Sequence, residues 1–454
     1  MTTVTTQPRQ LNRVLRIRDG LAVTVGIVIG AGILGTPGLI AGYLGDPWII
    51  LGMWFFGGVM AGLSTLVLAE MAAALPEAGG KYVFARHAWG DTMGFVAGWS
   101  EIFVTRGFSG ASKAVLIATY LFLLSSDTGE APAGPWVGIV ALAVVLCYFV
   151  LHTRGLKAST TFQNVTTAIK IFIILAIAAV GIAGGNASGL GTEPLLSGEA
   201  TAGLLGYALA YQSISFAYYG WEDAAKMSEE VMDPGRALPK ILLGGAMAVM
   251  VLYLLMNVSF LAALTPAQMA GSELVAADAT VAVFGEAAGT VVIVASLLIL
   301  ISSANVNFLG LPRVAFGLAR HGLAPRAFSE VDKRGTPRKA LYAISAWIGL
   351  LALTGAFELL IRFMMTVAIT VDTMVLLGYF KLRASRPDLE RPFKMPGHPV
   401  LPALTIVLYI AILVILIATQ WQLAIGAGAM LLAMLIGGIV TTSRNRAASG
   451  GSAA

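Results

Sequence analysis

Long apolar stretches separated by short polar segments recur along the whole chain of 454 residues. Each stretch has about 20 mostly apolar residues in a row, the length at which a helix crosses the hydrocarbon core of a bilayer. The pattern predicts an all-α membrane protein with twelve transmembrane helices, near residues 21–44, 48–75, 93–124, 133–151, 163–186, 202–222, 240–264, 286–311, 340–356, 359–380, 400–419 and 421–441.

Composition excludes a soluble enzyme and a disordered chain. Hydrophobic residues make up 57% of the chain and Asp, Glu, Lys and Arg only 12%, whereas soluble proteins carry about 25% charged residues. Cys147 is the single cysteine, so no disulfide forms within the chain. The histidines His87, His152, His321 and His398 lie far apart in the sequence, so we expect no metal site and no cofactor.

Basic residues are confined to alternate loops. The N-terminal segment and every second loop, together with the C-terminal tail, hold 25 of the 29 Lys and Arg residues, and the opposite loops hold none. Because basic loops stay on the cytoplasmic side, both termini are predicted to be cytoplasmic. The net charge of +5 then reflects topology, and no nucleic-acid partner is expected.

Two predicted helices carry signs of a break in mid-membrane. The first contains four glycines and a proline between Gly26 and Pro37, and the sixth has Gly220 between aromatic and acidic residues. Close packing of small residues would explain the first feature alone. Interruptions at corresponding places in two halves of a chain instead indicate a transporter binding site.

The exposed ends of such half-helices predict the ligand. Free N–H groups near Gly30 to Gly32 would attract an anion such as a carboxylate. Free carbonyls near Phe216 to Tyr219 would suit an ammonium group. A site with both fits a zwitterion, and an α-amino acid is the obvious candidate.

Ionisable side chains inside predicted spans are expensive and usually functional. Lys170 lies about 10 Å into its helix, at 1.5 Å per residue, and we expect it to have a functional role. Glu101 and Arg106 are expected to form ion pairs with other helices. Lys113 and Arg362 are expected to extend toward the outer surface.

Two acidic residues in spans have structural interpretations. Asp372 is expected to pair with an Arg or Lys inside the bundle. Glu70, near the inner end of its helix, is expected to belong to the cytoplasmic gate or to a loop network.

The ordered set of short motifs resembles the amino acid–polyamine–organocation (APC) superfamily, close to its LAT-like branch. The resemblance covers about residues 20–420. Its motifs are Gly-Ala-Gly-Ile-Leu-Gly-Thr-Pro at 30–37, Leu-Pro-Glu-Ala-Gly-Gly-Lys-Tyr-Val at 75–83, Phe-Ala-Tyr-Tyr-Gly-Trp at 216–221, Ala-Arg-His-Gly-Leu-Ala-Pro at 319–325 and Arg-Pro-Asp-Leu-Glu-Arg-Pro-Phe at 386–393.

The resemblance implies a LeuT-type fold with broken helices 1 and 6. Residues 20–187 and 202–383 would be inverted repeats of five helices each, and residues 399–441 would add two helices. Residues 1–19 would be a cytoplasmic segment and residues 442–454 a disordered cytoplasmic tail.

The resemblance also implies the site residues. The substrate carboxylate would bind at the amides of Ala31 and Gly32, beside Gly30. The amino group would bind the carbonyls of Phe216, Ala217 and Tyr219, beside Gly220. Phe216 would cover the substrate on the outer side. Lys170 would replace a bound sodium ion, bridging helices 1 and 5 and Ser303 of helix 8.

Three departures from the family pattern concern the substrate. Ala31 stands where serine is common, Tyr219 where the large-neutral transporters have glycine, and Glu222 where they have asparagine. Glu222 could pair with a cationic substrate, carry a proton or bond to a neighbouring helix.

The predicted function is sodium-independent secondary transport of an amino acid across the plasma membrane, by proton symport or substrate exchange. A polyamine or amine carrier of the same fold is the alternative. No filter loop of a channel and no motif of an intramembrane enzyme is visible. Expected partners are the amino acid, the lipid bilayer and protons, without a heavy-chain subunit.

The predicted topology can be tested with single cysteines in a Cys147→Ala background. Ser272→Cys lies in a predicted outer loop and should react with an impermeant thiol reagent added to whole cells. Ser329→Cys lies in a predicted cytoplasmic loop and should stay unlabelled until the membrane is permeabilised. The opposite labelling pattern would rule out the twelve-span arrangement.

Overall fold

The computed structural model describes residues 16–77, 79–126, 131–132, 134–153, 156–185, 189–191, 203–220, 231–330 and 337–450. The regular elements of these residues are all helices. They are α1 (Ile17–Val28), α2 (Ala31–Gly35), α3 (Pro37–Leu44), α4 (Pro47–Ala74), α5 (Lys81–Trp89), α6 (Asp91–Trp99), η1 (Ser100–Arg106), α7 (Gly107–Ser125), α8 (Trp136–Thr153), α9 (Leu156–Gly184), α10 (Gly203–Tyr218), α12 (Pro234–Ala263), α13 (Pro266–Ala270), α14 (Val275–Phe284), α15 (Glu286–Arg320), η3 (Arg326–Ser329), α16 (Arg338–Ala352), α17 (Phe357–Ser385), α18 (Val400–Thr419) and α19 (Trp421–Gly450).

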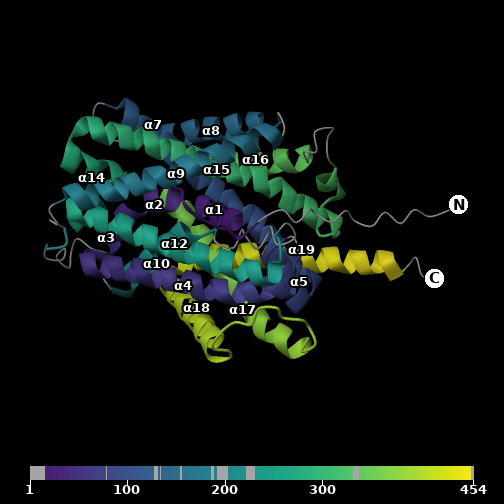
Figure 1. Ribbon diagram of the computed structural model, residues 1–454. Coiled ribbons are helices and arrows are strands. Elements are labelled where there is room, and N and C mark those ends of the chain that lie inside the picture. Colours follow the sequence, from purple (N-terminus) through teal and green to yellow (C-terminus); the bar gives the residue numbers. More distant parts are fainter. Residues whose placement is uncertain are drawn as a thin grey trace.

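Most of the long helices run side by side in an elongated bundle (Figure 1). Helices α3 and α14 lie at one end of this bundle, and α5 lies at the opposite end with the C-terminal part of α19 (Figure 1). We call the α5 end the inner end, since the predicted topology puts its basic segments in the cytoplasm.

Nine helical segments of the described residues are long and apolar enough to cross a membrane. The sequence predicts twelve. The three further predicted spans coincide with α9, α10 and α16, and their membrane crossing stays a prediction. The protein is thus a multi-pass membrane protein, and the regular elements of its described residues are helices.

Several helices extend beyond the apolar stretches that predict them. Helix α15 runs on to Arg320 and α17 to Ser385. Helix α19 continues to Gly450, so residues 442–450, expected in a disordered tail, are helical. Hydropathy marks the part of a helix in lipid, and a helix needs no apolar residues where it leaves the bilayer.

Local signals explain where helices begin. The Asp46 carboxylate caps α4 by accepting hydrogen bonds from the amides of Trp48 at 2.8 Å and Ile49 at 2.9 Å. Pro47 occupies the first helical position, where its missing N–H costs nothing.

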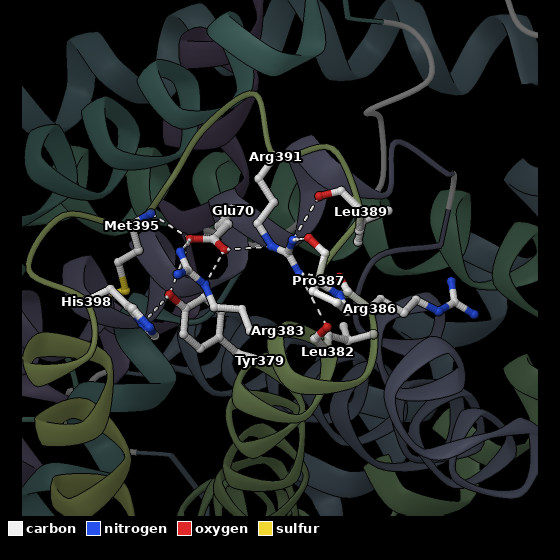
Figure 2. A network of polar contacts seen from close by, with 10 residues as sticks. All are labelled: Glu70, Tyr379, Leu382, Arg383, Arg386, Pro387, Leu389, Arg391, Met395 and His398. Atoms are coloured by element: carbon white, nitrogen blue, oxygen red, sulfur yellow. Dashed lines mark hydrogen bonds and ion pairs between the residues drawn. The ribbon is translucent and has the colours of Figure 1, made fainter.

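A buried carboxylate organises the inner end of the bundle. Glu70, near the end of α4, is 2% exposed and accepts two hydrogen bonds from the Arg383 guanidinium at 2.8 and 2.7 Å. It also accepts the amide N–H of Met395 at 2.7 Å, and Arg391 lies 3.4 Å away. Figure 2 shows these groups converging on one carboxylate. The prediction that Glu70 belongs to a network here is confirmed.

This network attaches the segment between α17 and α18 to the body of the protein. The Arg391 guanidinium donates to the carbonyls of Leu389 at 2.8 Å and Arg386 at 3.0 Å, which folds the segment back on itself (Figure 2). Tyr379 donates to Glu70 at 3.3 Å and contacts His398 at 3.1 Å.

Replacing Glu70 should destabilise the protein. In Glu70→Gln the Arg383 and Arg391 cations lose their shared counter-ion, and removing one partner of a buried ion pair costs about 3–5 kcal/mol. We expect a clearly lower midpoint in thermal unfolding of the detergent-solubilised protein.

The exposed pair Lys339–Glu330, with side chains 56% and 62% exposed, provides the matched control. Lys339→Met should change stability by less than about 1 kcal/mol. Equal effects of the two substitutions would contradict a structural role for the Glu70 network.

Candidate functional site

The first predicted helix is interrupted as expected. Helix α1 ends at Val28, and α2 begins at Ala31 after a fully extended Gly30. The first amides of α2 have no partner within the helix, because an α-helix leaves its first N–H groups unbonded. Thr36 keeps a helical conformation, so the helical path continues through α2 into α3.

In the sixth predicted span the helix ends where the break is predicted. Helix α10 ends at Tyr218, and Gly220 follows with φ of 118°, a conformation that side-chain-bearing residues rarely adopt. Residues 221–230, and with them Glu222, lie outside the described residues.

Glycines allow the two interruptions to touch each other. A Cβ atom on Gly32 would lie 2.1 Å from the Cα of Ala217, so α2 and α10 meet backbone to backbone. A Cβ atom on Gly30 would lie 2.2 Å from the hydroxyl of Ser303 on α15. Packing of α2 against α10 therefore requires glycine at position 32, whether or not a ligand binds there. A larger residue would disturb the contact between the two helices.

One tyrosine bonds to both broken helices. The Tyr253 hydroxyl, on α12, lies 3.0 Å from the carbonyl oxygen of Val28 and 3.2 Å from that of Ala217. Both carbonyls sit where a helix stops and their usual intrahelical donors are missing. Tyr253 supplies a donor at this point, and the sequence contained no local signal for it.

A central cavity opens between these interruptions. Five of the predicted site residues from the first and sixth spans line it: Ala31, Gly32, Phe216, Tyr219 and Gly220. Ser303 of α15, predicted as a partner of Lys170, lines it too. Its remaining lining comes from Ile27, Val28, Thr105, Arg106, Ser109, Lys113 and Met364. The Phe216 ring meets that of Phe357 edge to face, with 6.0 Å between centroids.

Two cationic side chains reach the cavity from the η1–α7 helix. Arg106 donates to Glu101 at 2.9 Å, so these two residues pair with each other within one helix. This pairing was missed because residues five apart do not face each other on an α-helix. Ser100–Arg106 form a π-helix instead, whose bonds join residues five apart.

Lys113 does not follow the prediction that it extends toward the outer surface. It lines the cavity, and its ammonium lies 3.4 Å from the Ser303 carbonyl. Arg106, Ser109 and Lys113 are three and four residues apart, which places them on one helix face. That spacing was the available signal for these missed residues.

Lys170 is 1% exposed and lies beside the first interruption. Its ammonium donates to the carbonyl of Gly26 on α1 at 3.2 Å, which joins α9 to α1. The Ser303 hydroxyl is buried and has no hydrogen-bond partner within the described part of the chain. The bond from Lys170 to Ser303 that the family resemblance implies is thus not made between the described atoms.

Asp372 pairs inside the bundle, as expected. Its partner is Lys81, which the sequence placed in a cytoplasmic loop. Among the described residues no cluster of His, Cys, Asp and Glu could hold a metal ion.

Comparison with known proteins agrees with this geometry. The sequence pattern of the family described as amino acid permease matches residues 19–440. The b(0,+)-type amino acid transporter 1 of Mus musculus is 27% identical over 423 residues, covering 91% of this chain and 84% of the relative.

Two bacterial relatives are also similar. The serine/threonine exchanger SteT of Bacillus subtilis is 24% identical, with 88% of this chain and 90% of the relative covered. The branched-chain amino acid permease BcaP of Lactococcus lactis is 24% identical, with coverage of 87% and 88%. These relatives are transporters and not enzymes. The family match spans nearly the whole chain and includes both broken helices, so this protein belongs to the amino acid permease family of the APC superfamily.

Proposed function

We propose that this protein is a secondary active transporter that moves an amino acid across the plasma membrane by alternating access. The observation that carries the proposal is the central cavity, which both helix interruptions line. Irregular backbone at membrane depth is tolerated where it lines a cavity or is satisfied by protein. In transporters, such interruptions form the substrate site.

The proposed substrate pose follows from the helix ends. The carboxylate binds the free amides of Ala31 and Gly32 at the start of the α2–α3 path. The ammonium binds carbonyls at the end of α10, at Phe216, Ala217 and Tyr219. The carbonyls of Phe216 and Ala217 already have protein donors, Tyr219 N–H at 3.2 Å and Tyr253, but a carbonyl oxygen accepts two hydrogen bonds.

Sodium-independent transport is proposed on the basis of Lys170. Its ammonium lies against the α1 carbonyl of Gly26, and a second cation at the same place would be repelled. Energy would then come from proton symport or from exchange of substrates. Glu222 remains a candidate for the proton-carrying group, and Ser303 for a partner of Lys170 during the cycle.

The polyamine alternative is less favoured by the cavity lining. Arg106 and Lys113 both line the cavity, and a polyamine would bring two or more ammonium groups toward them. The proposal also includes the two inverted repeats of five helices and a cytoplasmic position for both termini. It further includes transport without a heavy-chain subunit.

Transport in liposomes containing the purified protein tests the proposal directly. A panel of radiolabelled amino acids and polyamines should give saturable uptake of an amino acid, with and without an imposed proton gradient. Counterflow driven by unlabelled substrate would identify a carrier, because a channel does not couple the two fluxes. Uptake that needs sodium would contradict the proposed role of Lys170.

Loss of the substrate carboxylate should weaken binding strongly. We expect the α-amino alcohol of the best substrate to compete at least about 100-fold less well than the amino acid, since hydrogen bonds to a charged group contribute about 1.5–3 kcal/mol each. Competition is measured against labelled substrate at constant pH. Equal competition by both compounds would contradict a carboxylate site at Ala31 and Gly32.

Removing the Lys170 ammonium should impair transport more than folding. Lys170→Ala should lower initial uptake by about tenfold or more, because a buried charged group at the helix break is lost. The control Lys240→Ala removes an exposed lysine and should leave uptake unchanged. Normal uptake by Lys170→Ala would assign this residue to packing, and sodium stimulation of the variant would support the view that it replaces a cation.

A further inference from the structure

Side chains from α5, from α17 and from the turn after α10 meet on the inner side of the central cavity. The Lys81 ammonium, at the start of α5, pairs with Asp372 of α17 and donates to the Tyr219 hydroxyl at 2.8 Å. The same ammonium lies 4.6 Å from the centre of the Tyr219 ring. Lys81 is 6% exposed and Asp372 is 8% exposed. We call Lys81, Asp372 and Tyr219 the Lys81 cluster.

The local backbone brings Lys81 inward from a segment that sequence reasoning treated as a loop. Gly79 and Gly80 adopt φ of 138° and 60°, and α5 begins directly after them. Only glycine takes such angles readily, so this turn depends on both glycines. As a result, Lys81 lies inside the bundle and not among the solvated basic residues.

The cluster lies between the central cavity and the inner end of the protein. On α17, Met364 lines the central cavity, Asp372 follows eight residues later and Arg383 binds Glu70 at the inner end. At 1.5 Å per residue, Asp372 is about 12 Å from Met364 and about 16 Å from Arg383 along the helix. The ion pair therefore occupies an intermediate depth.

Small cavities continue from the central one toward this ion pair. Tyr219 lines the central cavity and also a second cavity, which Asp372 and Tyr409 line as well. A third cavity is lined by Asp372, Tyr409 and Lys81. Successive cavities thus share wall residues, and Lys81 and Asp372 lie at a depth between the central cavity and the inner end.

The free-energy cost of burying charge argues against the view that the Lys81–Asp372 pair only stabilises the fold. A buried ion pair is rarely more stable than apolar residues of the same volume, because both charges must be desolvated. Lys81 and Asp372 belong to different helices, α5 and α17, so the pair can break when these helices separate. Intramembrane charges are usually retained where they act in the transport pathway.

We propose that the Lys81–Asp372 pair is the inner gate of the substrate pathway and that Tyr219 links this gate to the occupied substrate cavity. This inference rests on the proposed transport function. Tyr219 lines the central cavity and accepts a hydrogen bond from Lys81, so a substrate that moves its ring also changes the contacts of the gating ammonium. Lys81 and Asp372 are gating residues and do not touch the substrate.

Thiol accessibility tests the gate without requiring transport. Ala61 on α4 is 6% exposed and lines the second cavity with Tyr219 and Asp372. Ala61→Cys in a Cys147→Ala background places one thiol there. In inside-out vesicles, an impermeant reagent should label this thiol slowly. Lys81→Met or Asp372→Asn should speed labelling by about tenfold or more, since breaking one partner opens the pair.

The charge-reversed variant, Lys81→Asp with Asp372→Lys, should return labelling toward the slow rate, which a nonspecific loss of packing would not do. Asp91→Asn breaks the exposed Arg86–Asp91 pair, 2.9 Å long, and should leave labelling unchanged. Monodisperse elution in size-exclusion chromatography identifies the variants that are folded. Unchanged labelling in folded Lys81→Met and Asp372→Asn would overturn the gate.

Tyr219→Phe separates the link from the gate, because it keeps the ring and removes the oxygen that accepts from Lys81. In the parent, adding a mixture of the standard L-amino acids should change the labelling rate of Ala61→Cys by about threefold or more, as expected for a ligand that shifts a two-state equilibrium. In Tyr219→Phe this response should disappear, and restoring the hydroxyl by reversion to tyrosine should bring it back. An unaltered response would overturn the role of Tyr219.

The two proposals fail in different ways. If Lys81→Met and Asp372→Asn speed labelling but the protein shows no measurable uptake, the gate is supported and the transport proposal is contradicted. If uptake is normal but labelling is the same with and without the ion pair, the transport proposal is supported and the gate is contradicted.

Discussion

The contact between Gly32 of α2 and Ala217 of α10 is the constraint on which the rest of the site depends. Two helices that stop inside the bundle leave amides and carbonyls at their ends without intrahelical partners. The backbone-to-backbone contact brings these groups to one place, and Tyr253 bonds to carbonyls of both broken helices. A cavity with polar backbone on its walls follows from that contact.

Charges inside the bundle are held in two different ways. Glu70 is surrounded by several donors, and its network connects α4, α17 and the segment before α18 into one rigid inner corner. Lys81 and Asp372 form a smaller cluster next to cavities. A network with many partners resists separation, whereas a pair between two helices separates when those helices move. The Glu70 network therefore suits a part of the protein that stays fixed, and the Lys81–Asp372 pair suits helices that move apart.

Much of this architecture could be predicted from the sequence. Hydropathy located every predicted span on a helix, and the glycines at 30 and 32 marked the first interruption correctly. Ala31, Gly32, Phe216, Tyr219, Gly220 and Ser303 line one cavity, and their roles in transport stay predictions. The positions of the helices and of the first interruption follow from local signals, namely residue type, periodicity and motif order.

What could not be predicted depends on contacts between distant segments. Lys81 looks like one more basic loop residue until the turn at Gly79 and Gly80 directs it toward α17. Tyr253 lies in an ordinary apolar helix, and only the packed structure brings its hydroxyl to Val28 and Ala217. Lys113 was assigned to the outer surface because depth along a helix was considered without the face on which the residue lies.

The π-helix at Ser100–Arg106 gives the cavity an electrostatic character that amino-acid composition alone does not determine. A change in helical register by one residue rotates everything that follows by about 100°. Arg106, Ser109 and Lys113 face the cavity from this register, and an α-helical path through the same residues would turn them toward other neighbours. A single insertion or deletion within Ser100–Arg106 would therefore turn the Lys113 side chain away from the central cavity while leaving this lysine in the sequence.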